Sequence, residues 1–198
     1  MSSFVSDYSI KAMELLEEAQ TATDEFAAKT QIKCREGCGQ CCLKPGIEVQ
    51  VVEMLPLAMS LVENSEADKW YDQAARDPSG RCVFYAPDPR DETLGRCQQY
   101  ALRPSLCRLF GFAAVSTKDT KHPALAACFW HKRLQPETVA AAQTAIDNGT
   151  EVPLFADFHM RMFALAPTPS LSEIMPINQA LMFAIEKVEL LARQKDAK

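Results

Sequence analysis

The eight cysteines are the residues of this sequence best suited to chemistry. Four lie within nine residues and four are spread along the following part of the chain: Cys34, Cys38, Cys41 and Cys42, then Cys82, Cys97, Cys107 and Cys128. Thiolates are good ligands for zinc and iron, and clustered cysteines in a compartment that keeps thiols reduced are more often metal ligands or catalytic groups than disulfides. The spacing therefore predicts a metal centre that joins distant parts of the chain.

The neighbours of the cysteines agree with this chemistry. Gly37 and Gly39 lie within the first group, where a missing Cβ lets the backbone pass close to a metal. A metal bound by four thiolates carries a net charge of about −2, which favours nearby cations. Four of the ten arginines directly adjoin a cysteine, namely Arg35, Arg81, Arg96 and Arg108. We expect Arg35, Arg96 and Arg108 to line the centre; the alternative is that they simply occupy exposed loops.

Arg103 and Tyr100 form a second pair of candidates, because they lie on one turn just before Cys107. Arg103 precedes Pro104, which disfavours helical backbone angles for it. We expect its guanidinium to fold back across the loop and hydrogen-bond to backbone carbonyls around the first cysteine group, with Tyr100 packed beside it.

These residues together resemble the YkgJ-type cysteine-cluster family. The resemblance begins at the run Cys34-x3-Cys38-x2-Cys41-Cys42 and continues through Gly95-Arg96-Cys97, Tyr100, the Arg103–Phe110 block and Cys128. Members of that family are described as zinc- or iron-chelating domains that begin with a CxxCxxCC motif. This chain departs from the motif by one extra residue in the first spacing and by a longer loop after Cys82. The resemblance covers roughly residues 34–128 and implies that all eight cysteines are metal ligands.

The sequence leaves the metal open. Zinc and iron, the latter also as a 4Fe–4S cluster, are both compatible with thiolate ligands. Two zinc sites of four cysteines would use all eight, and Cys41 and Cys42 could then serve different sites because neighbouring side chains diverge. The spacing of Cys34, Cys38 and Cys41 also occurs in radical-SAM enzymes, but the 156 residues after Cys42 are too few for most of their barrel.

The histidines are weaker candidates. His131 follows Cys128 by three residues and could be a reserve ligand or a hydrogen-bond donor beside the centre. His122 is expected on a surface loop. His159 lies in a segment rich in methionine and phenylalanine, which predicts a core helix or a partner surface.

Three functions remain open. The first is a metal-binding protein with a redox or metal-handling role. The second is a structural zinc module whose outer helices bind a protein partner. The third is a protein-modifying enzyme that uses an iron–sulfur cluster, for example a protein methylase. No binding site for a methyl donor is recognisable in the sequence, so whether the chain is an enzyme is undecided.

The composition of the chain bears on its partners and its cellular location. The net charge of −5 argues against a nucleic-acid partner, and no apolar run is long enough for a membrane span. We expect no membrane partner and, since no secretory leader is visible, a cytoplasmic location.

The elements that must position the cysteines are mainly helical. Apolar residues at helical spacing predict a helix over 6–29 and a second over 48–62, bent at Pro56. Further predicted elements are a helix over 65–76, extended pieces at 82–85 and 94–98, a helical turn at 103–110, and helices at 136–148, 153–165 and 171–195. The proline-rich segment 86–91 is predicted as a loop.

The sequence thus predicts a mainly α fold with an irregular cysteine-rich metal-binding core and one or two very short β pieces. We expect a single domain over 1–198, in which the core 34–128 is flanked by helical segments 6–29 and 136–195.

Overall fold

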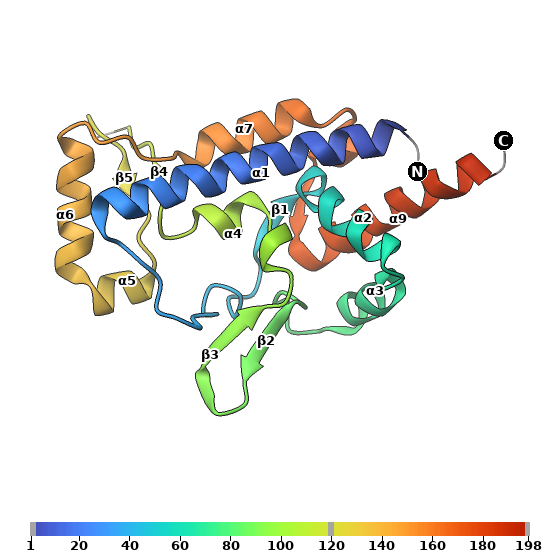
Figure 1. Cartoon of the computed structure of the whole chain (residues 1–198), viewed down its shortest axis with the longest axis horizontal. Helices are drawn as coiled ribbons and strands as arrows, with labels where there is room; N and C mark the ends of the chain where they lie inside the picture. The colour runs from blue at the N-terminus through green and yellow to red at the C-terminus, as the bar shows by residue number, and fades with distance from the viewer. Residues whose placement is uncertain (1–2, 119–120, 197–198) are drawn as a thin grey trace. The chain divides into compact units, whose positions relative to one another are not determined.

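The structure is a computed structural model that describes residues 3–118 and 121–196 (Figure 1). It is mainly helical with short strands, which confirms the predicted fold class. The chain divides into two compact units: unit 1 comprises Met1–Glu14, Gly37–Pro104 and Met162–Lys198, and unit 2 comprises Leu15–Glu36 and Ser105–Arg161.

The elements follow one another along the chain with short connections. In order they are α1 Ser3–Thr30, β1 Glu48–Gln50, the 3₁₀ helix η1 Val51–Met54, α2 Leu55–Glu63, α3 Ala67–Arg76, β2 Tyr85–Asp88, β3 Asp91–Cys97, the 3₁₀ helix η2 Tyr100–Leu102, α4 Ser105–Leu109, β4 Ala114–Val115, β5 Ala124–Leu125, α5 Phe129–Leu134, α6 Pro136–Asp147, α7 Phe155–Leu165, α8 Pro169–Ser172, β6 Ile174–Pro176 and α9 Ile177–Asp196. Helices α1 and α7 each contribute residues to both units.

Unit 1 is built around α9, against which α2 and α3 pack (Figure 1). The apolar residues of these helices are the core of the unit, with Leu57 and Leu61 of α2, Trp70 of α3, and Leu181 and Ile185 of α9 all buried. Each such side chain contributes about 1.5–3 kcal/mol by leaving water. This core also contacts the segment that carries Cys82, because the Phe84 ring packs on Trp70.

The segment 48–62, predicted as one bent helix, is three elements. Residues Glu48–Gln50 form β1, which pairs antiparallel with β6. The η1 turn follows, and Pro56 then lies in the first turn of α2, where its missing N–H leaves no helical bond unmade. The prediction of a helix from residue 48 was therefore wrong, because a strand partner from the far end of the chain determines this backbone.

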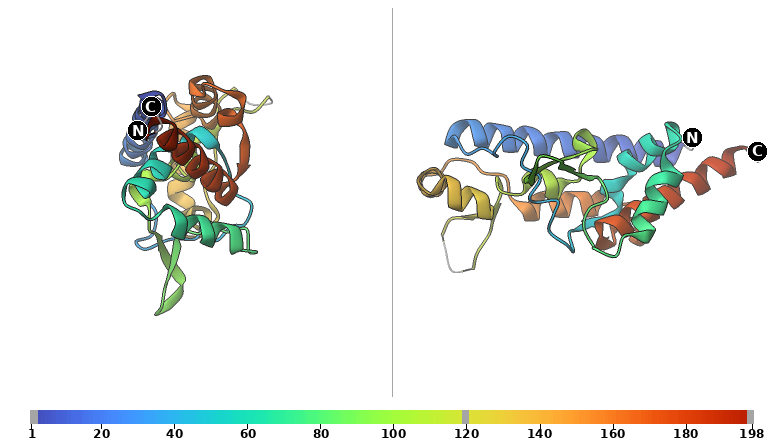
Figure 2. Two further views of the ribbon diagram at one scale, coloured as in Figure 1. Left: turned by 90° about the vertical axis from the view of Figure 1, so that its right-hand side faces the viewer. Right: turned by 90° about the horizontal axis from the view of Figure 1, so that it is seen from below.

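A β-hairpin carries Cys97. Strands β2 and β3 pair antiparallel with a register shift after Pro87, and the hairpin extends away from the helices of unit 1 (Figure 2). The loop predicted over 86–91 was wrong at residues 86–88, which belong to β2, and at Asp91, which begins β3. Pro87 is exposed, and a two-stranded hairpin has an outer edge on which a residue without an N–H is tolerated.

Unit 2 has its own core. Phe26 and Ile32 lie with Ala142 and Ile146 of α6 in a buried cluster, and Phe112 and Leu125 pack against it. The short strands β4 and β5 pair antiparallel beside it. The α5 helix and this strand pair were not predicted from the sequence, since both are too short for a periodic pattern.

Candidate metal centre

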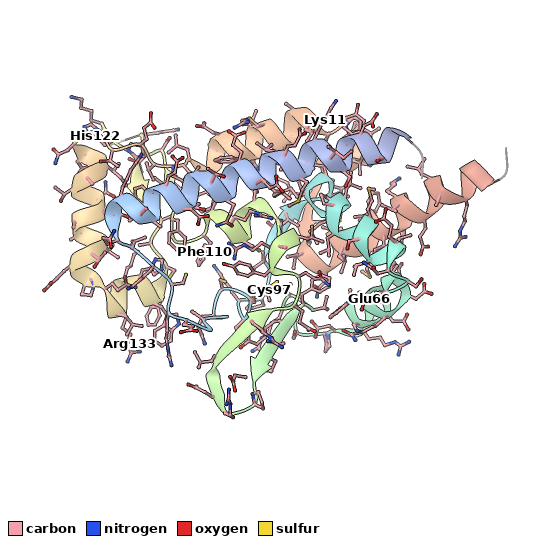
Figure 3. All side chains as sticks on the ribbon, in the orientation of Figure 1. Lys11, Glu66, Cys97, Phe110, His122 and Arg133 are labelled. Atoms are coloured by element: carbon pink, nitrogen blue, oxygen red, sulfur yellow. The ribbon has the colours of Figure 1, made fainter. Side chains whose placement is uncertain are left out.

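Unit 1 contains five of the eight cysteines. Cys38, Cys41 and Cys42 lie in the loop after Gly37, Cys82 is buried just before β2, and Cys97 ends β3, where Figure 3 labels it. All are free thiols.

The loop that carries Cys38, Cys41 and Cys42 contacts the β2–β3 hairpin directly. The Gly95 N–H donates to the Gly37 carbonyl at 2.8 Å, which joins the loop to β3. A Cβ at Gly39 would overlap the Tyr85 ring and lie 2.9 Å from the Gly95 carbonyl carbon, and a Cβ at Gly95 would also overlap that ring. Tyr85 is held in place because its hydroxyl donates to the Leu94 carbonyl at 3.1 Å. Glycine at both positions is therefore required for the loop to approach Cys97.

Cys82 is positioned by α9 and α3. Asn178 of α9 hydrogen-bonds to the residues on either side of it, accepting from the Val83 N–H at 3.1 Å and donating to the Arg81 carbonyl at 2.7 Å. Two residues later, the Phe84 ring packs on Trp70 of α3 with 4.5 Å between centroids. The core of unit 1 thus determines where this thiol lies.

The thiols of unit 1 act electrostatically on one another. A hydrogen bond from the Cys42 side chain, together with the positive charge of Arg103, lowers the pKa of Cys41 to about 6. Burial raises the pKa of Cys82 to about 12, and the charges of Cys97 and Cys41 act in the same direction. Burial likewise raises the pKa of Cys97, with Cys41 adding to the shift. The assignment of Cys41 and Cys42 to different metal sites stays a prediction.

Arg103 is a cation whose charge acts on the thiols of unit 1. Its positive charge lowers the pKa of Cys41 and opposes the rise at Cys97. Its guanidinium carbon lies 3.7 Å from the centroid of the Tyr100 ring, a cation–π contact. Tyr100 packs beside Arg103 as predicted, and the hydrogen bonds expected from Arg103 to carbonyls of the first cysteine group stay a prediction.

The other arginines have different surroundings. Arg35, in unit 2, and Arg96, on β3 of unit 1, have exposed side chains, whereas Arg108, on α4 of unit 2, is only 5% exposed. A buried guanidinium needs polar partners because burial removes it from water. The lining of a metal centre by these three residues stays a prediction.

Unit 2 contains Cys34, Cys107 and Cys128. Cys34 follows α1 and is exposed, Cys107 lies on α4, and Cys128 is the N-cap residue of α5. The Cys34 sulfur lies 3.7 Å from Nε2 of His131, and the backbone N–H of His131 donates to the Cys128 sulfur at 3.3 Å. The three-residue spacing of Cys128 and His131 was the sequence feature that pointed to this histidine.

Asn178 and Tyr85 are the residues that sequence reasoning missed. Nothing in the spacing around Asn178, 96 residues after Cys82, connects the two. The signal for Tyr85 was the pair of glycines that its ring covers. Gly39 directly follows Cys38, and Gly95 is separated from Cys97 by one residue, so both suggested a bulky neighbour close to the cysteines.

The donor chemistry of unit 1 fits zinc or iron. Unit 1 contains five free thiols, and the Cys41 charge raises the pKa of Cys82 and Cys97 while the Arg103 charge lowers the pKa of Cys41. Thiolates are the ligands that tetrahedral zinc and iron–sulfur clusters use. Within the described residues no three His, Cys, Asp or Glu side chains form a closed ligand set, so a bound metal would draw these sulfurs together.

Comparison with known proteins agrees with the thiol chemistry. The family model described as "CxxCxxCC: Putative zinc- or iron-chelating domain" matches residues 33–139, which contain all eight cysteines. No curated protein and no solved structure matches the chain. Across residues 3–118 and 121–196, none of the helices has the length and hydrophobicity that crossing a lipid bilayer requires. The match extends over more than half of the chain, and the protein belongs to the CxxCxxCC family of zinc- or iron-chelating domains.

Proposed function

We propose that this protein binds zinc or iron through cysteine thiolates, and that unit 1 holds one complete centre. Its ligands are four of five thiols, Cys38, Cys41, Cys42, Cys82 and Cys97. The observation that carries the proposal is that one compact unit gathers five free thiols from distant parts of the chain, with the loop of Cys38, Cys41 and Cys42 hydrogen-bonded to the hairpin of Cys97 through Gly37 and Gly95. Cys34, Cys107 and Cys128 complete the proposed set of eight ligands.

Arg103 has a defined part in this proposal. Four thiolates around a divalent zinc ion leave a net charge of about −2. A guanidinium whose charge already acts on Cys41 and Cys97 partly neutralises it. Such a neighbour favours the ionised thiols that a metal needs. Arg35, Arg96 and Arg108 remain part of the proposal as weaker contributors to the same charge balance.

The cellular role that we favour is redox or metal handling. Cys38, Cys41 and Cys42 are each partly exposed, so a metal bound there would be within reach of a donor or acceptor. The proposal includes a reducing compartment such as the cytoplasm, because the eight cysteines are free thiols and metal ligation requires them to remain so. When bound, zinc would supply a structural link, and an iron–sulfur cluster would supply one-electron transfer.

A structural module with a protein partner is the second candidate. The Met160 and Phe163 side chains of α7 are 59% and 51% exposed. Side chains one helical turn apart lie on the same face of a helix, and an exposed apolar face there would suit a protein partner bound through this flanking helix.

The experiment that tests the proposal is metal analysis of the full chain after anaerobic purification. We expect a stoichiometric metal in either case. A colourless protein with zinc would favour the structural module, and a brown protein with an absorption band at about 400 nm would favour an iron–sulfur cluster and a redox role. A protein that contains neither metal and takes up neither on reconstitution would overturn the proposal.

A further inference from the structure

The imidazole of His131 is buried in unit 2 and contacts polar groups at both ring nitrogens. The side chain is only 2% exposed. Nδ1 lies 3.2 Å from the Gly111 carbonyl oxygen, and Nε2 lies 3.7 Å from the Cys34 sulfur. A carbonyl oxygen can only accept, so Nδ1 carries a proton. In the neutral ring the lone pair is then on Nε2, the nitrogen that faces Cys34.

This arrangement is the one that metal-binding histidines adopt. Such a histidine almost always donates its second ring N–H to a carbonyl or carboxylate, which determines the tautomer and the direction of the ring. A zinc ion with ordinary bond lengths and tetrahedral angles separates a ligating nitrogen from a ligating sulfur by about 3.6 Å. The Nε2 to sulfur distance of 3.7 Å therefore has the length expected across one zinc ion.

Cys128 provides another sulfur next to the same ring. Its sulfur already accepts the His131 backbone N–H at 3.3 Å. The Cys128 Cβ and the His131 Cε1 lie 3.7 Å and 2.9 Å from the position that a Cβ at Gly111 would occupy. Gly111 has a φ of +89°, so glycine suits both the backbone and the crowding here. The ring and the Cys128 side chain thus share one small space.

From this geometry we infer that His131 is a metal ligand and that unit 2 holds a zinc site of its own, made by Cys34, Cys128 and His131. Cys107, on α4 of the same unit, is the candidate for the fourth position. A mixed set of cysteine and histidine is typical of structural zinc, whereas 4Fe–4S clusters are held by cysteines. The described side chains do not form a closed set of three, so the inference includes a movement of the thiol side chains when the ion binds.

The inference rests on the proposed function in one respect, since Cys34 and Cys128 must act as thiolate ligands. It goes beyond that function by adding a nitrogen ligand, assigning the metal and separating this site from the thiolate centre of unit 1.

The test compares zinc stoichiometry in the full chain after reconstitution under reducing conditions. We expect His131→Gln and Cys34→Ser each to bind about one zinc fewer than the unmodified chain, because losing one of four ligands removes most of the affinity. His159→Gln is the matched control, since this exposed histidine lies in the same unit, and it should bind the full complement.

His131→Cys keeps the test decisive if the glutamine variant fails to fold. Cysteine restores a ligand, so this variant should bind the full complement. With Co²⁺ in place of zinc, replacing nitrogen by sulfur should shift the visible d–d bands to longer wavelength and strengthen the sulfur-to-cobalt absorption in the near ultraviolet.

The outcomes separate this inference from the proposed function. A chain that binds no metal overturns both. A chain that binds metal but loses none with His131→Gln, or whose Co²⁺ spectrum is unchanged by His131→Cys, overturns the histidine site and leaves the centre of unit 1 standing.

Discussion

The side-chain amide of Asn178 hydrogen-bonds to the backbone on both sides of Cys82. Its nitrogen donates to the Arg81 carbonyl at 2.7 Å, and its oxygen accepts from the Val83 N–H at 3.1 Å. Asn178 is 8% exposed and lies in the first turn of α9, the helix around which unit 1 is built. The thiol proposed as a ligand is therefore oriented by a residue that is not itself a ligand.

We predict that Asn178→Asp weakens metal binding by unit 1. The carboxylate has almost the same shape but cannot donate to the Arg81 carbonyl, and an unmet buried carbonyl costs about 1–3 kcal/mol. Competition with a chromophoric chelator should show roughly a tenfold or larger loss of affinity, as about 1.4 kcal/mol corresponds to a factor of ten. Asn148→Asp, at an exposed position after α6, is the control. Equal affinities for the two variants would show that Asn178 does not position Cys82.

Gly39→Ala and Gly95→Ala are predicted to displace the cysteine loop from the hairpin. An added methyl group at either position would overlap the Tyr85 ring. The ring cannot move freely, because its hydroxyl donates a hydrogen bond to the Leu94 carbonyl. We expect a clear loss of bound metal with helical content retained, measured by metal analysis and circular dichroism on the same samples.

Gly46→Ala is the matched control for these two variants. Its φ of +70° makes alanine unfavourable there, but no atom lies within 4 Å of the added Cβ. It should therefore lose some stability, about 1 kcal/mol, and keep its metal. Full metal retention in Gly39→Ala and Gly95→Ala would contradict the close-approach argument.

Arg103→Gln should reduce metal retention more than Arg103→Lys does. Glutamine removes the positive charge that acts on Cys41 and Cys97, whereas lysine keeps a charge but loses the planar group that stacks on Tyr100. Arg76→Gln is the comparison, since Arg76 is exposed and forms a local ion pair with Asp72 on α3. Dissociation rates into excess chelator would measure the order; identical rates for all three would remove the charge argument.

Removal of the metal is predicted to destabilise unit 1. The residues between Gly37 and Gly46 form turns and bends without helix or strand, so little else fixes this loop once thiolate–metal bonds are lost. A strong chelator should lower the melting temperature by about 10 °C or more, or abolish cooperative melting. Calorimetry before and after chelation, with restoration by added zinc, gives the measurement. An unchanged melting curve after verified metal removal would refute the link between metal and folding.

The helices were largely predictable because their determinants are local. The apolar spacing that predicts a helix over 6–29 is realised as α1, and the segments predicted at 65–76, 136–148 and 153–165 correspond to α3, α6 and α7. The helix predicted over 171–195 was right for α9 but missed the break at β6. That strand and β1 depend on each other across more than 120 residues, which no local pattern encodes.

The sequence by itself determined the chemistry of this protein: eight cysteines, the glycines and arginines beside them, and the family to which their order belongs. Only the tertiary structure decided which side chains meet. It separates Cys34 from Cys38 into different units, places Asn178 around Cys82, and brings the His131 ring to Cys34 from 97 residues away. The reason is physical: residue type and spacing decide what a side chain can bind, whereas the packing of α9 and α5 decides where the chain returns to meet it.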